Sequence, residues 1–156
     1  MRKKFVISLI ALVIVSTSAS AMAIGGAFSL DALGGGAYGA ALSLKLDDFQ
    51  PVLGISARGG GGTMNIGLTA DWWMYHEPLA GIISLYVGPG GYLVATGLGG
   101  DANMDIGARV PVGFQIFPID PLEIFVELAP SLGIALSPFA FPTFGLQAAF
   151  GFRFWF

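Results

Sequence analysis

Apolar residues alternate with small or polar residues along most of the chain that follows the first 23 positions. At the carboxyl end, in TFGLQAAFGFRFWF, every even-numbered residue from Phe144 to Phe156 is apolar, and the odd-numbered residues are small or polar apart from Trp155. The stretches TMNIGLTADWWM, NMDIGARVPVGFQIF and LEIFVELAPSLGIAL follow the same rule. A period of two is typical of β-strands whose two faces meet different surroundings.

Applied along the whole chain, this alternation predicts eight strands. They lie near residues 24–32, 37–47, 51–60, 63–74, 79–95, 102–117, 121–136 and 143–156. These lengths reach or exceed the roughly 9 to 11 residues that a tilted strand needs to cross the hydrocarbon layer of a membrane. We therefore expect one all-β domain over residues 24–156, an antiparallel up-and-down transmembrane barrel of about eight strands.

The composition indicates why such a chain belongs in a membrane. Hydrophobic residues make up 54% of the sequence, charged residues only 11%, and 24 residues are glycine, which is far from the composition of an ordinary soluble domain. Beyond the first 23 positions, Gly, Pro or polar residues interrupt every candidate for the run of roughly 20 apolar residues that a membrane-spanning helix requires. A closed barrel is then the remaining structure that pairs all of its backbone groups in hydrocarbon.

The amino-terminal 23 residues have the order of a cleavable secretory signal peptide. Basic Arg2, Lys3 and Lys4 precede an apolar run, and small residues follow, so we expect cleavage after Ala21 or Ala23. The chain has no cysteine, which excludes a lipid-modified amino terminus and a disulfide framework. Without the signal peptide, four basic residues face ten acidic ones, so nucleic acid is not expected as a partner.

The charged residues of the predicted strands all fall on the polar face. We expect them to fill the narrow lumen of an eight-stranded barrel as a network of ion pairs, because an Arg or Lys that faced lipid at the membrane midplane would cost roughly 2 to 4 kcal/mol. A soluble barrel would show the reverse arrangement. The predicted lumen network comprises Asp31, Lys45, Arg58, Asp71, Asp105, Arg109, Glu123, Glu127 and Arg153.

The links between the predicted strands indicate an orientation. The proline-containing links DDFQP, YHEP and FPIDP, after the second, fourth and sixth strands, are compact and suit the periplasmic side. The links at 34–36, 59–62, 96–101 and 137–142 are then the cell-surface loops, although they are short for that role. Aromatic residues near strand ends are typical of interfacial girdles, and Tyr86 and Tyr92 fall under the same interpretation. The expected girdle comprises Trp72, Trp73, Tyr75 and Trp155.

The terminal GFRFWF resembles the carboxyl-terminal signal that the outer-membrane assembly machinery recognises. In that signal the last residue is Phe, and apolar or aromatic residues alternate back from it, as Phe156, Phe154, Phe152 and Phe150 do here. As an architecture, the whole mature chain is similar to the small eight-stranded outer-membrane proteins of the OmpA transmembrane-domain, OmpX and OmpW type. The resemblance implies insertion into the bacterial outer membrane with the help of periplasmic chaperones and the assembly machinery.

Candidate chemistry is sparse. His76, the only histidine, has no serine near it in the sequence and falls in an expected turn, so the nucleophile and base of a lipid A hydrolase or acyltransferase are not assembled. Asp101, Asn103 and Asp105 begin like a calcium loop, but Ile106 and Val112 replace the required glycine and glutamate. A weak surface calcium contact is the alternative that these carboxylates leave open. The glycine runs lack the Lys-Ser or Lys-Thr of a phosphate-binding loop.

These patterns predict a monomeric, non-enzymatic barrel in outer-membrane lipid, with no cofactor and a structural or envelope-related role. The first alternative is a narrow channel or small-solute conduit of OmpW type, in which Arg and Glu side chains set selectivity. A surface-binding protein and a lipid-modifying enzyme are the others.

Overall fold

The structure of the chain is a computed structural model that describes residues 22–33, 36–46, 49–97 and 103–156. Among these residues, no helix is long and apolar enough to cross a membrane. The described chain forms eleven β-strands. They are β1 (Met22–Asp31), β2 (Tyr38–Leu46), β3 (Pro51–Gly60), β4 (Thr63–Trp72), β5 (Tyr75–Ala80), β6 (Ile83–Val87), β7 (Gly90–Thr96), β8 (Asn103–Arg109), β9 (Val112–Ile119), β10 (Leu122–Leu136) and β11 (Phe139–Trp155).

Eight of these strands form a closed, antiparallel hydrogen-bonded ring. Its order is β11-β1-β2-β3-β4-β7-β8-β10, and β10 pairs with β11 to complete it. The predicted fold class is therefore confirmed. The ring closes where the chain begins and ends, because β1 pairs with β11 from Ala23↔Trp155 to Asp31↔Gln147. Met22 and Phe156 extend this closure by exchanging two backbone hydrogen bonds of 3.2 and 2.8 Å.

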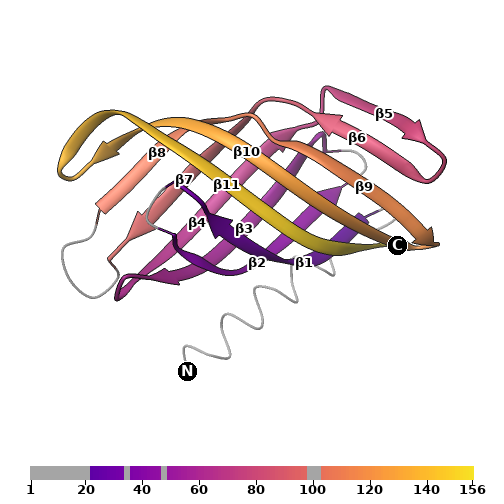
Figure 1. The fold of residues 1–156 in the computed structure, drawn as a ribbon, viewed down its shortest axis with the longest axis horizontal. Helices are drawn as coiled ribbons and strands as arrows, with labels where there is room; N and C mark the ends of the chain where they lie inside the picture. The colour runs from indigo at the N-terminus through magenta and orange to yellow at the C-terminus, as the bar shows by residue number, and fades with distance from the viewer. Residues whose placement is uncertain (1–21, 34–35, 47–48, 98–102) are drawn as a thin grey trace.

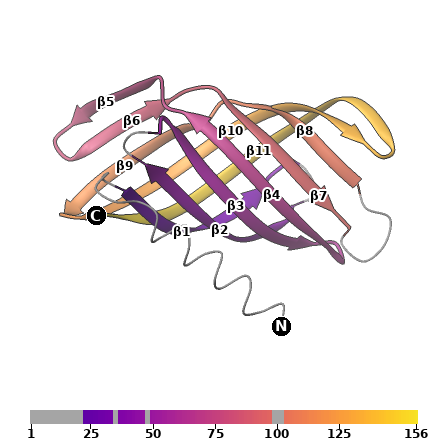
Figure 2. The same ribbon diagram turned by 180° about the vertical axis from the view of Figure 1, so that it is seen from behind.

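The three remaining strands continue barrel strands beyond short breaks. β5 follows β4 after Trp73–Met74, β6 precedes β7 across Gly88–Pro89, and β9 follows β8 after Val110–Pro111. Proline has no backbone N–H to donate to a ladder, which accounts for interruptions at Pro89 and Pro111. β6 pairs with β9, and β5 pairs with β6, so the β5–β6 hairpin projects beyond the ring at the end where the chain terminates (Figures 1 and 2).

The break between β4 and β5 is a bulge. Asp71 pairs with Gly90 and Tyr75 with Val87, so three residues on one strand face two on the other. One extra residue moves every following side chain to the opposite face. As a result Glu77 lies on the same face as Leu85, and it is exposed there. The apolar face therefore carries one charge at Glu77, on the projecting hairpin, a residue that the sequence pattern assigned to a link and not to a strand.

The strand connections gather at two ends of the barrel. The proximal end holds Met22, Phe156, the end of β2, the start of β3 and the turns at Gly81–Ile82 and Asp120–Pro121. The distal end holds the ends of β1 and β7, the starts of β2 and β8, and the turns at Gly61–Gly62 and Ser137–Pro138. Gly61 and Gly62 have φ values of 60° and 82°, the left-handed conformation that a two-residue hairpin turn of this kind requires.

Several predicted boundaries differ from those of the structure. YHEP, expected as a link, belongs to β5, since the fourth strand continues past its bulge to Ala80. The sequence at 139–142, expected as part of a surface loop, lies in β11 because the β10–β11 hairpin turns at Ser137–Pro138. The signal peptide predicted at 1–23 lies outside the described residues except for Met22 and Ala23, which belong to β1. Parts of the links at 34–36, 47–51 and 96–101 also lie outside them.

The outward face of the ring is apolar along every strand. Outward side chains such as Leu42, Leu68, Ile106 and Phe150 are about half exposed, whereas six of the inward charged residues are buried. Burial alternates residue by residue along β10, where Glu123, Phe125 and Glu127 point in and Ile124, Val126 and Leu128 point out. The molecule therefore has a polar interior and an apolar exterior, the inverse of a soluble barrel.

Candidate functional site: the polar lumen

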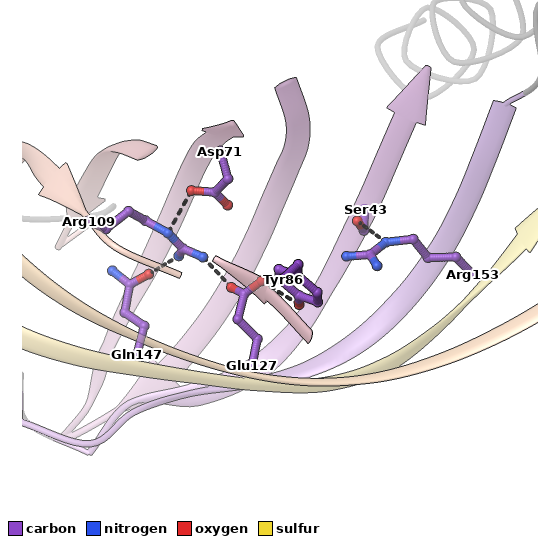
Figure 3. Close-up of polar contacts among 7 residues, drawn as sticks. All are labelled: Ser43, Asp71, Tyr86, Arg109, Glu127, Gln147 and Arg153. Atoms are coloured by element: carbon purple, nitrogen blue, oxygen red, sulfur yellow. Dashed lines mark hydrogen bonds and ion pairs between the residues drawn. The ribbon is translucent and has the colours of Figure 1, made fainter. Parts of the chain in front are cut away.

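Arg109 is the centre of the largest polar cluster inside the barrel (Figure 3). Its Nε lies 2.9 Å from Asp71 Oδ1, its guanidinium also pairs with Glu127, and its Nη1 donates to Gln147 Oε1 at 2.6 Å. Tyr86 Oη donates to Glu127 Oε2 at 2.8 Å. These residues come from β4, β8, β10, β11 and β6, so the cluster joins opposite parts of the barrel wall. Arg109, Asp71 and Glu127 are all at least 90% buried.

Arg153 forms a second cluster nearer the proximal end. Its guanidinium pairs with Glu123, its register partner, and its Nε donates to Ser43 Oγ at 2.8 Å. Trp155 Nε1 donates to Glu123 Oε2 at 2.8 Å. The Arg153 guanidinium also lies 3.8 Å from the centre of the Phe125 ring, a cation–π contact. Hydrogen bonds thus reach both charges of this buried pair, which offsets part of the cost of removing them from water.

The other residues of the predicted lumen network are placed outside these two clusters. Arg58 is buried and interacts electrostatically with Asp31. Asp105 accepts hydrogen bonds from Tyr92 Oη at 2.9 Å and Thr143 Oγ1 at 3.4 Å. Lys45, at the proximal end of β2, donates to the Leu46 carbonyl at 3.1 Å. The structure therefore divides the predicted network into the Arg109 and Arg153 clusters and a distal group around Arg58 and Asp105.

Four aromatic residues expected at the membrane interface lie inside the barrel, so that expectation is wrong for them. The Trp73 ring stacks on the Tyr86 ring, with centroids 4.4 Å apart, and lies 5.3 Å from the Arg153 guanidinium. Trp155 turns inward to reach Glu123, and Tyr92 turns inward to reach Asp105. The hydrogen bonds of their polar tips explain the placement of Tyr86, Tyr92 and Trp155. Trp73 is placed by its ring contacts, because its buried indole N–H has no hydrogen-bond partner. Trp72 and Tyr75 are exposed on the outer surface.

The inward glycines make room for the tyrosine side chains in the lumen. Sequence analysis missed this packing. A Cβ on Gly113 would lie 2.2 Å from Tyr86 Cζ, and a Cβ on Gly133 would lie 2.2 Å from Tyr92 Oη. Gly113 and Tyr86 are register partners on β9 and β6. The signal that could have revealed this packing is a tyrosine on the polar face of a predicted strand, opposite a glycine on the neighbouring strand.

The sequence motifs weighed for catalysis and calcium binding lie outside the Arg109 and Arg153 clusters. His76 lies on β5, and the Gln115 side-chain amide donates to its Nε2. No hydroxyl of the described residues hydrogen-bonds to His76. Asp101 lies outside the described residues, whereas Asn103 accepts from the Ser137 backbone N–H at 3.2 Å. The described part of the chain contains no group of three His, Cys, Asp or Glu residues arranged to hold a metal ion.

The described side chains leave space inside the ring. A cavity of about 70 Å³ lies among Ser29, Ser43, Arg58, Asp71 and Phe125. A larger space of about 430 Å³, which we call the distal vestibule, opens at the distal end. Its lining includes Asp31, Asn65, Tyr92, Asp105, Ser131 and Gln147. Gln147 borders both spaces and accepts the Arg109 hydrogen bond, so the Arg109 cluster lies between them.

The proposed assembly signal occupies the outer face of β11. Phe150, Phe152 and Phe154 are 40–61% exposed, and Phe156, just past the end of the strand, is 73% exposed. All three strand residues are register partners of apolar residues on β10 (Val126, Ile124 and Leu122). This places them on the barrel surface that the neighbouring strands share.

Comparison with known proteins identifies the fold and no closer kinship. No protein-family model matches the sequence. A search of curated proteins also finds no match. Among solved structures, the chain is similar to neisserial surface protein A (NspA), with a TM-score of 0.59 and 12% sequence identity over 88% of this chain and 97% of the other. This chain therefore has the fold of NspA, an eight-stranded antiparallel barrel.

Proposed function

We propose that this protein is an outer-membrane barrel of the bacterial envelope with a structural role and a closed lumen. The observation that carries the proposal is the combination of an apolar exterior with a lumen crossed by buried ion pairs. The exterior suits lipid, since the described ring exposes Leu, Ile, Phe and Val side chains and turns the charged side chains of its strands inward. The fold shared with NspA supports the same location.

The closed lumen is supported by what lies between its two ends. Asp71, Arg109, Glu127 and Gln147 join β4, β8, β10 and β11, and the cavity that all four of them line holds about 70 Å³. That is room for a few water molecules, since each needs roughly 10–15 Å³ of such space. Toward the proximal end, the Trp73, Tyr86 and Phe125 rings pack around Arg153. We infer that these side chains leave a hydrated ion no continuous path through the barrel.

The test is conductance of the refolded protein in a planar lipid bilayer. We expect no discrete current steps from the natural sequence. A narrow conduit would instead give steps whose ion selectivity changes in Glu127→Gln, and that result would replace the structural role with transport. Asp120→Asn is the matched control, because it removes a carboxylate from an exposed turn instead of the lumen.

The structural role itself is tested in cells. Deletion of the gene should increase the sensitivity of the envelope to detergents and large antibiotics, and expression of the natural protein should restore resistance. A conduction-silent Glu127→Gln variant should restore resistance equally well. Full resistance in the deletion strain under these conditions would contradict the proposal.

A further inference from the structure

The distal vestibule has the size of a ligand site. Its volume of about 430 Å³ lies within the range of roughly 300–1,000 Å³ that is usual for small-molecule pockets. Inward residues of β1, β4, β7, β8, β10 and β11 line it, and the Arg109 cluster forms its floor through Gln147. The rigid wall of the barrel therefore defines this space, in contrast to a site built on a loop.

The described lining of the vestibule carries negative charges and no positive ones. Its lining contains Asp31 and Asp105 but no Lys or Arg among the described residues. Asp31 interacts electrostatically with Arg58 below it. Asp105 accepts hydrogen bonds from the neutral hydroxyls of Tyr92 and Thr143 and has no ion-pair partner within the described chain. Asp71, Glu123 and Glu127, by contrast, each pair with an arginine.

A second, independent feature is an acceptor without a donor. Asn65 lines the vestibule and is only 8% exposed, yet its side-chain oxygen has no hydrogen-bond partner. A buried polar atom in this state costs free energy, and such atoms in native proteins call for a water, an ion or a ligand. The vestibule thus offers a carboxylate without an ion-pair partner and an amide oxygen without a hydrogen-bond donor.

We propose that the distal vestibule binds a small organic cation that carries a primary ammonium group. An ammonium group has three N–H donors and no acceptor, which matches a lining rich in acceptors. Its positive charge complements Asp105, and its donors can reach acceptors such as Asn65 that the barrel leaves unused. The site needs no open lumen, because the Arg109 cluster closes the space below it.

The experiment measures binding to the refolded full-length barrel by calorimetry at constant ionic strength. Butane-1,4-diamine is the probe, and butan-1-ol and butyrate are its neutral and anionic counterparts. We expect saturable binding of the diamine alone. Asp105→Asn, which keeps an oxygen acceptor for Tyr92, should weaken diamine binding at least tenfold. Asp120→Asn removes the same charge from an exposed proximal turn and should leave binding unchanged.

A second variant protects the test against a folding defect. Asn65→Ala should weaken diamine binding several-fold, even where Asp105→Asn fails to refold. Equal binding of the diamine and butan-1-ol would overturn the proposal. So would a loss of affinity in Asp120→Asn as large as that in Asp105→Asn, since it would indicate only general attraction to an acidic protein.

Discussion

Glu123 and Arg153 are register partners on β10 and β11, and their side chains form an ion pair in which they are 0% and 2% exposed. Such a pair is costly to break, because the charge that remains is buried without a partner. Replacing both residues of the pair with well-packed apolar residues costs less, because that leaves no buried charge without a partner. The pair therefore allows the stability of the barrel to be separated from the charge of its lumen.

We expect Arg153→Met to lower the free energy of unfolding by about 3–5 kcal/mol, because it leaves the buried Glu123 carboxylate uncompensated. The double variant Arg153→Met/Glu123→Leu should recover most of this loss. Chemical unfolding in phospholipid vesicles, followed by tryptophan fluorescence, measures both. A single variant that unfolds within 1 kcal/mol of the natural protein would contradict the expected cost.

Gly113→Ala should destabilise the barrel by about 1–3 kcal/mol, the usual cost of overpacking. The new Cβ would lie 2.2 Å from Tyr86 Cζ, so the ring would have to leave its position beside Trp73 and Glu127. Gly91→Ala is the matched control, since its Cβ would meet nothing closer than 3.7 Å. Equal free energies of unfolding for the two variants would show that the position of the Tyr86 side chain does not depend on Gly113.

Leu42 and Leu79 are nearly equally exposed, at 56% and 57%, but only Leu42 lies in the middle of a ring strand. Leu42→Arg should cost about 2–4 kcal/mol in a lipid bilayer, because it places a cation near the midplane. Leu79→Arg, on the projecting β5–β6 hairpin, should cost no more than about 1 kcal/mol. The same vesicle unfolding assay distinguishes them, and equal costs would refute this placement of the membrane.

Deletion of Phe156, or Phe154→Asp, should reduce the amount of protein that inserts into the outer membrane. Phe154 lies on the outer face, and Phe156 exchanges two backbone hydrogen bonds with Met22 where the ring closes. Cell fractionation, with folded and unfolded forms separated by electrophoresis without heating, gives the inserted fraction. Asp120→Asn serves as the control, and natural levels of insertion in both Phe variants would contradict the assigned role.

The alternation of residue types determined the fold class, the eight barrel strands and the face of most side chains. A period of two is a local property of each strand, and lipid requires one face of every ring strand to be apolar. The pattern can therefore be recognised without knowing which strands are neighbours. Arg58, Asp71, Arg109, Glu123, Glu127 and Arg153 are buried for this reason. The alternation also showed that many glycines face inward. It did not show that Tyr86 and Tyr92 fill the space beside them.

Tertiary structure decided which of these side chains meet. Arg109 on β8 reaches Asp71 on β4 and Glu127 on β10 because the stagger of all the strands sets the heights of their side chains in the lumen. The same stagger brings Tyr86 over Gly113. The bulge at Trp73–Met74 depends on pairing with Gly88–Pro89, so the alternation along the chain did not show that YHEP continues the fourth strand with its two faces exchanged. The local sequence thus determines whether a side chain faces the lumen or the lipid. Which side chains meet in the lumen depends on how the whole ring closes.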